Sequence, residues 1–134
     1  MSESIKLTET FNGKPAEVYD AWLDSKKHSD MTGGIAVCSN KVNGEFSAWD
    51  GYITGSNIEL TENKVIIQYW RTSEFDDNDN DSILSIEFKK VENGTEITLI
   101  HNNIPKGQTQ YKEGWEQHYF SPMRNYFNNQ KQSS

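Results

Sequence analysis

The sequence has 134 residues, of which 25% are charged and 34% are apolar, and 16 of the apolar residues are Trp, Tyr or Phe. A chain of this length can bury one sizeable core, so residues 1–134 are expected to form a single domain, ordered from about residue 4 to residue 128. Because 20 acidic residues outnumber 13 basic ones, the formal net charge of −7 argues against nucleic acid or an anionic membrane as a partner.

The sequence carries no signal for export or membrane insertion. Its first residues, MSESIKLTETF, lack a basic start followed by an apolar run, and no apolar stretch of 18 residues occurs anywhere. Cys38 is the only cysteine, which excludes an internal disulfide. A cytoplasmic location is therefore expected.

The first quarter of the chain predicts one strand and two short helices. Residues 4–11 alternate imperfectly, as a strand does, and end at a turn pair of Asn and Gly. Pro15 suits the first position of a helix, and apolar residues follow it at helical spacing. A second short helix, capped by Asp24 or Ser25, is predicted to run to about Met31.

The middle of the chain predicts an antiparallel meander, because turn signals separate strand-like runs at short intervals. The clearest hairpin is SILSIEFKKVENGTEITLIH, with its turn at Asn93-Gly94. In the run VIIQYWR, simple alternation favours Val65, Ile67 and Tyr69 as the inward residues.

The acidic run DDNDNDSILSIE places oxygen-bearing side chains at the spacing of an EF-hand calcium loop. Asp81, however, stands at the sixth position of that loop, where the backbone conformation favours glycine. The flanking segments are rich in β-branched and aromatic residues, so they predict strands where an EF-hand needs helices. Residues 76–81 are therefore expected to form the polar tip of a hairpin, with weak adhesion of divalent cations as the alternative and no dedicated metal site.

The last part of the chain predicts one long amphipathic helix from Tyr111 to Phe127. The buried stripe expected on this helix is Tyr111, Trp115, His118, Tyr119, Pro122, Met123 and Tyr126. Pro122 removes a backbone hydrogen bond and predicts a kink. Gly114 costs a helix interior ~1 kcal/mol relative to alanine, so a close backbone approach is expected there. Together the elements predict an α+β architecture in which this helix covers one face of the sheet.

Five segments carry a resemblance to a known family: PAEVYDAWLD, GEFSAWDGYITGSNIEL, VIIQYWR, GTEITLIHNNIP and YKEGWEQHYFSPMRNYF. In this order, from about Phe11 to Phe127, they resemble the C-terminal-like domain of the family named after the activator of the heat-shock protein 90 ATPase. That family belongs to the SRPBCC or START-like superfamily. The resemblance implies a helix-grip fold, in which a curved antiparallel sheet of about six strands wraps around a long C-terminal helix, with two short helices after the first strand.

The resemblance also bears on function. Relatives either hold apolar ligands in a cavity between sheet and helix or close that cavity and serve as platforms for protein partners. It implies that Ile66, Gln68 and Trp70 point inward, contrary to simple alternation, and we follow the resemblance. The activator proper has a separate N-terminal docking domain, for which this chain has no room, so co-chaperone activity is not expected to transfer directly.

The candidate lining of such a cavity combines aromatic and apolar side chains with two histidines: Phe46, Trp70, His101, Trp115, His118, Tyr119 and Met123. The histidines would supply the polar contact that orients a ligand. The alternative, which is the usual role of a histidine on an apolar face, is that each is a structural histidine hydrogen-bonded to a neighbour. No nucleophile elbow, zinc-ligand spacing or phosphate-binding loop occurs, so no catalytic residue, metal or cofactor is predicted.

Three hypotheses about function follow. The leading one is a small, non-catalytic helix-grip domain that binds an apolar or amphipathic small molecule between the sheet and the last helix. The competing one is a protein-binding, co-chaperone-like module that acts on the heat-shock protein 90 ATPase. Its candidate contact is Phe120, which lies opposite the expected buried stripe. The third is a cyclase-like or hydrolase-like enzyme of the same superfamily, in which His101 would be required for turnover.

Overall fold

The computed structural model describes residues 3–132, and it describes side chains from residue 3 to residue 129. Six strands form one antiparallel sheet in the order β1-β6-β5-β4-β3-β2. The strands are β1 Glu3–Phe11, β2 Glu45–Ala48, β3 Ile53–Thr61, β4 Val65–Thr72, β5 Ser82–Val91 and β6 Gly94–Ile104. The helices are α1 Pro15–Leu23, α2 Ser25–Thr32, α3 Tyr111–Trp115 and α4 Ser121–Gln132, with the π-helical turn Glu116–Phe120 between the last two.

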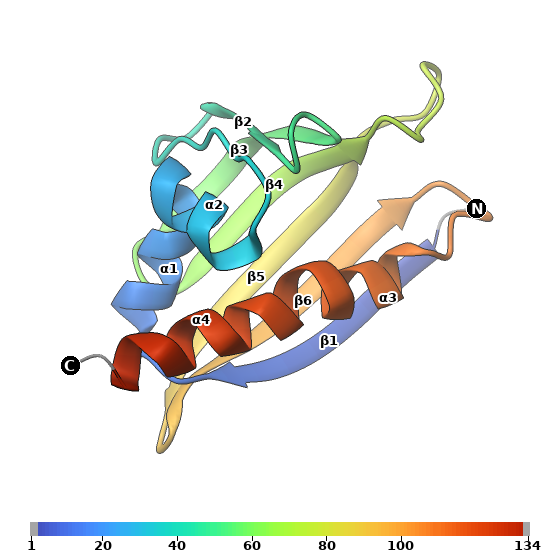
Figure 1. Ribbon diagram of the computed structural model, residues 1–134. Helices are drawn as coiled ribbons and strands as arrows, with labels where there is room; N and C mark the ends of the chain where they lie inside the picture. Colours follow the sequence, from blue (N-terminus) through green and yellow to red (C-terminus); the bar gives the residue numbers. More distant parts are fainter. Residues whose placement is uncertain (1–2, 133–134) are drawn as a thin grey trace.

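The helices all lie on one side of the sheet. Figure 1 shows α3 and α4 running along one face, with α1 and α2 packed beside them on the same side. The α+β helix-grip architecture expected from the sequence is confirmed, including the two short helices after the first strand. The core therefore lies between the sheet and the C-terminal helix. The candidate site described below lies between the same two layers.

Local signals in the sequence explain the two short helices. Pro15 occupies the first turn of α1, where its missing N–H costs nothing. The Asp24 carboxylate accepts a hydrogen bond from the backbone N–H of Lys27 at 2.9 Å and caps α2. Gly33, with φ 87°, ends α2 in the left-handed conformation that glycine adopts without strain.

The inward face of β4 is the one that the resemblance implied. Ile66, Gln68 and Trp70 are buried, whereas Tyr69 is 44% exposed on the outer face. Simple alternation was wrong here because both faces of this strand carry large apolar or aromatic side chains, so the pattern alone does not identify the buried side.

The hairpin between β5 and β6 turns one residue earlier than expected. Val91 pairs with Gly94, so the turn residues are Glu92 and Asn93. Gly94 has φ 145°, and a Cβ atom there would lie 2.0 Å from the carbonyl oxygen of Phe11. The glycine is thus required by its positive φ and by the close approach of β1.

The C-terminal helix departs from the expected stripe because of its π-helical turn. The N–H of Ser121 donates to the carbonyl of Glu116, five residues earlier, and Pro122 has no N–H to donate to His118. The wider turn adds one residue and shifts the buried face. Phe120, expected to be exposed, is only 3% exposed, whereas His118, expected on the buried stripe, is exposed.

Two further expectations about this helix need correction. The kink expected at Pro122 takes the form of the π-helical turn that precedes it. The close backbone approach expected at Gly114 is absent, because a Cβ atom built there meets no described atom within 4 Å. Gly114 borders open space instead.

The acidic run forms the tip of the hairpin between β4 and β5, and Arg71 organises it. The Arg71 guanidinium lies 2.8 Å from the Asp81 carboxylate and donates to the backbone carbonyls of Asp76, at 2.9 Å, and Asp79, at 3.2 Å. Among the described residues, no group of three or more His, Cys, Asp or Glu side chains converges as metal ligands would. In residues 3–132, no helix is both long and apolar enough to cross a membrane.

Candidate functional site

A pocket of about 490 Å³ lies between the inner face of the sheet and the C-terminal helix. Its walls come from β3 and β4, from the loop that joins β2 to β3, and from residues 110–119. Six aromatic side chains line it: Trp49, Tyr52, Trp70, Tyr111, Trp115 and Tyr119. Its position matches the cavity expected from the sequence, so this pocket is the candidate site.

The structure brings four of the seven expected lining residues to this pocket. These are Trp70, Trp115, His118 and Tyr119. His118 reaches it from the exposed side, where its ring lies 5.4 Å from that of Trp49. The other three do not line the pocket.

Each of these three lies elsewhere for a packing reason. Met123 is fully buried in the core, on the stripe where the sequence placed it, and does not reach the pocket. Phe46 is half-buried at the edge of the sheet, where its ring covers Gly55. His101 is fully buried behind Trp70 and Trp115, whose ring centroids lie 4.5 Å and 5.7 Å from its own.

His101 is a structural histidine, as the alternative reading of the sequence held. Its Nδ1 accepts a hydrogen bond from the Trp115 indole N–H at 3.1 Å, so the ring proton lies on Nε2, which donates to the Ser82 hydroxyl at 2.8 Å. The Ser82 hydroxyl in turn donates to the carbonyl of Trp70. Burial lowers the pKa of His101 to about 3. Both ring nitrogens are therefore engaged, and this side chain has no free base to offer a ligand.

A second buried histidine, His28 on α2, was not identified from the sequence. Its Nδ1 donates to the carbonyl of Trp22 at 2.8 Å, and its Nε2 accepts from the Tyr119 hydroxyl at 3.0 Å. Burial lowers the pKa of His28 and raises that of Tyr119, so both side chains are held neutral. The rings of Trp22 and Tyr119 stack with centroids 5.1 Å apart. This cluster fixes the Tyr119 wall of the pocket from behind.

A buried amide pair was also missed. The Gln68 side-chain amide donates to Oδ1 of Asn57 at 2.9 Å, and Nδ2 of Asn57 donates to the backbone carbonyls of Ser39 and Lys41 at 2.8 Å and 2.9 Å. The pair ties the loop after α2 to β3 and β4. The only sequence signal was a Gln and an Asn at inward-facing strand positions. This signal indicates a buried hydrogen-bonded pair only once the inward face of each strand is known.

Trp49 closes the outer end of the pocket. A Cβ atom on Gly34 would lie 2.4 Å from the Trp49 ring, so the indole rests directly on the glycine backbone. Trp49, Asp50 and Gly51 all have positive φ, at 53°, 57° and 89°. The Trp49 indole N–H is buried and has no hydrogen-bond partner among the described residues. This aromatic wall is thus held in a conformation that costs energy.

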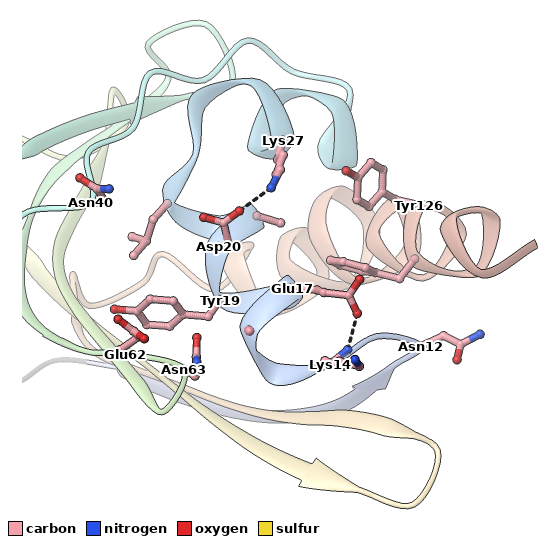
Figure 2. Close-up of a pocket in the computed structure, with 14 residues that line it drawn as sticks. Asn12, Lys14, Glu17, Tyr19, Asp20, Lys27, Asn40, Glu62, Asn63 and Tyr126 are labelled. Atoms are coloured by element: carbon pink, nitrogen blue, oxygen red, sulfur yellow. Dashed lines mark hydrogen bonds and ion pairs between the residues drawn. The ribbon is translucent and has the colours of Figure 1, made fainter. Parts of the chain in front are cut away.

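A larger depression of about 800 Å³ lies beside α1 and is bordered by the turn between β3 and β4 and by α4. Its lining is more polar and more charged than that of the aromatic pocket. Figure 2 shows its charged side chains, which come mainly from α1 and its flanks. Lys27 pairs with Asp20, and the Glu17 carboxylate accepts from the backbone N–H of Lys14 at 2.8 Å. Because these charges are of both signs and Lys27 and Asp20 pair with each other, the depression shows no preference for a ligand of one charge.

Two curated proteins with sequences similar to this chain are both named as activators of a heat shock protein ATPase. The chain is 24% identical over 130 residues to "Activator of 90 kDa heat shock protein ATPase homolog" of Dictyostelium discoideum, which covers 94% of this chain and 33% of that protein. It is 24% identical over 124 residues to "Activator of 90 kDa heat shock protein ATPase homolog 1" of Homo sapiens, covering 92% of this chain and 36% of that protein. The chain therefore spans about a third of the length of these relatives.

Solved structures show the same likeness. An HSP90 activator from Plasmodium falciparum superposes with a TM-score of 0.85 and 28% identity, over 93% of this chain and 96% of that one. A protein from Mesorhizobium loti superposes with a TM-score of 0.81 at 13% identity, over 95% of this chain and 98% of that one, which shows the shared fold alone. The model of the family "Activator of Hsp90 ATPase homolog 1-like protein" matches residues 12–128, and the chain belongs to this family.

Proposed function

We propose that the protein is a binding module that acts on the ATPase of an Hsp90-type chaperone. The observation that carries this proposal is the likeness to the Plasmodium falciparum HSP90 activator, at 28% identity and a TM-score of 0.85. The match covers 96% of that crystallised chain, so the likeness extends over nearly all of it. The longer relatives named as activators support the same partner.

The contact surface for such a partner must differ from the one expected from the sequence, because Phe120 is buried. The best replacement is the pair Ile35 and Val37, whose exposed fractions are 65% and 60%. Their segment runs beside β2, since the backbone N–H and carbonyl of Val37 both bond to Ser47. Two large aliphatic side chains exposed on a segment held by such bonds favour a protein-binding surface.

The test is the rate of ATP hydrolysis by a purified Hsp90-type chaperone with and without the purified domain. Stimulation by the wild-type domain, and its loss in a double variant Ile35→Lys with Val37→Lys, is the expected result. Tyr69→Lys is the matched control, because Tyr69 is also exposed but lies on the outer face of the sheet. No stimulation at saturating domain would refute the function, whereas loss in the control alone would refute only the surface.

A second function is favoured by the aromatic pocket itself. We propose that it binds a small molecule, because about 490 Å³ lies within the range of roughly 300–1,000 Å³ typical of small-molecule sites. A native mass spectrum of gently purified protein, compared with a denatured one, should show an extra mass that denaturation removes. Gly114→Phe should abolish it, because the Gly114 Cβ position faces open space beside the pocket. Lys112→Phe, an exposed position on the same helix, is the control. An extra mass that persists in Gly114→Phe would place the ligand elsewhere.

A further inference from the structure

We propose that the aromatic pocket selects an apolar organic cation, such as a quaternary ammonium group carried on an aromatic or hydrocarbon body. This inference rests on the second proposal above, that the pocket binds a small molecule, and it specifies the charge of that molecule. Three features of the pocket favour a cation: the aromatic rings that line it, the partners of their polar atoms, and the charges at its rim.

The lining consists mainly of aromatic rings that pack on one another. The Trp70 ring lies 5.5 Å from that of Trp115 and 5.3 Å from that of Tyr111, and the Trp115 ring lies 4.9 Å from that of Tyr119. Trp49 and Tyr52 complete the lining from the loop between β2 and β3. The faces of such rings carry negative electrostatic potential, so they attract a desolvated cation and repel an anion.

Most of the polar atoms of these aromatic side chains already have partners, so they offer few donors to a carboxylate or phosphate. The Tyr111 hydroxyl bonds to Thr72 and to Gln108, each at 2.7 Å, and the Tyr52 hydroxyl bonds to Glu74. Trp115 and Tyr119 direct their polar atoms to the two buried histidines described above. The Trp49 N–H is unpartnered but is shielded from solvent and from the pocket volume. What the aromatic side chains mainly present to a ligand is ring carbon.

Charge at the rim has the same sign as the ring faces. Glu113 is the one acidic residue of the lining, and none of the described residues that line the pocket is a lysine or an arginine. Gln110, Gln117 and His118 supply the other polar side chains. The formal net charge of −7 adds long-range attraction for a cation. An anionic lipid or organic acid would find no lysine or arginine among the described residues of this lining.

The test uses three probes in which a benzyl group is attached to a quaternary centre and which differ chiefly in charge: benzyltrimethylammonium, its neutral isostere 2,2-dimethyl-1-phenylpropane, and 2,2-dimethyl-3-phenylpropanoate. Binding is measured by calorimetry and by quenching of tryptophan fluorescence, since three of the four tryptophans line the pocket. The cation should bind at least about tenfold more tightly than the neutral probe, as a desolvated cation over aromatic rings does, and the anion most weakly.

Two variants with matched controls locate the effect. Tyr52→Leu keeps an apolar side chain but removes a ring, and Glu113→Gln removes the rim charge, so each should weaken the cation several-fold while the neutral probe is unaffected. Tyr69→Leu and Glu87→Gln are the controls, because both side chains are exposed outside the pocket. Unchanged cation binding in both pocket variants would overturn the proposal.

The outcomes separate this inference from the one on which it rests. If the neutral probe or the anion binds as tightly as the cation, and Gly114→Phe abolishes that binding, the charge preference is refuted while the pocket remains a small-molecule site. If no probe binds to the wild-type protein, the charge preference is refuted, and the native mass spectrum decides separately whether the pocket is a small-molecule site.

Discussion

His101 should make the protein lose stability as the pH falls below neutrality. The neutral imidazole accepts from the Trp115 indole through Nδ1, and a proton placed on that nitrogen would oppose an indole N–H at 3.1 Å in a fully buried environment. Its pKa is about 3 in the folded protein against a reference value of 6.5. Between these values the unfolded chain binds more protons than the folded one, so acid favours unfolding.

The magnitude follows from the pKa difference. Each pH unit between the two pKa values changes the free energy of unfolding by ~1.4 kcal/mol, so His101 alone removes ~2 kcal/mol between pH 6.5 and pH 5. His28, whose pKa is also lowered by burial, acts in the same direction. No change is expected from this source above pH 7, where both the folded and the unfolded forms are neutral.

The assay is urea unfolding followed by tryptophan fluorescence at pH 7 and at pH 5. His101→Gln should reduce the pH dependence by ~2 kcal/mol, because an amide can still accept from Trp115 and donate to Ser82 but does not titrate. His118→Gln is the control, since that ring is exposed. An equal loss of stability from pH 7 to pH 5 in wild type and His101→Gln would refute the reasoning.

Three further predictions concern single substitutions. Trp115→Ala should lower the free energy of unfolding by ~3–5 kcal/mol in urea titrations, because it removes a buried ring that packs against the sheet; an unchanged midpoint would contradict that placement. Gly34→Ala should displace the Trp49 ring, on which a Cβ would intrude at 2.4 Å, and red-shift the tryptophan emission; an unaltered spectrum would show that the loop absorbs the methyl group. Arg71→Met should speed amide exchange in residues 76–81 while costing no more than ~1 kcal/mol in overall stability, and unchanged exchange would show that the loop does not depend on the guanidinium.

Most of the architecture could be read from the sequence, because it depends on local signals. Pro15 and Asp24 mark the starts of helices, and alternating runs mark strands, so the order of elements follows without tertiary information. The inward face of β4 could not be read in this way, since both faces of that strand are apolar. Only the family resemblance supplied it.

The candidate site was predicted in part. Trp70, Trp115 and Tyr119 were identified because large aromatic residues lie on elements expected to face each other. Trp49 was missed because it lies in a loop whose left-handed backbone has no simple sequence signature beyond the following Asp-Gly pair. His28 was missed because its structural role depends on a hydrogen bond with Tyr119, which lies 91 residues away in the sequence.

The errors about Phe120 and His118 have a common cause. The periodicity of 3.6 residues was applied to the whole last helix, but one π-helical turn divides that helix into two segments with different phases. Pro122 was recognised as an anomaly, and its missing N–H was expected to bend the helix rather than to change which side chains are buried.

The same turn has a consequence for comparing this chain with its relatives. A relative whose last helix is a continuous α-helix would carry one residue fewer across Glu116–Phe120. An alignment that puts the compensating gap elsewhere would match buried positions such as Phe127 with solvent-facing ones for the remainder of the helix. With that alignment, a substitution at a buried position would be compared with an exposed position of the relative, and a change that preserves the core would be scored as disruptive. The gap should therefore be placed inside the π-helical turn.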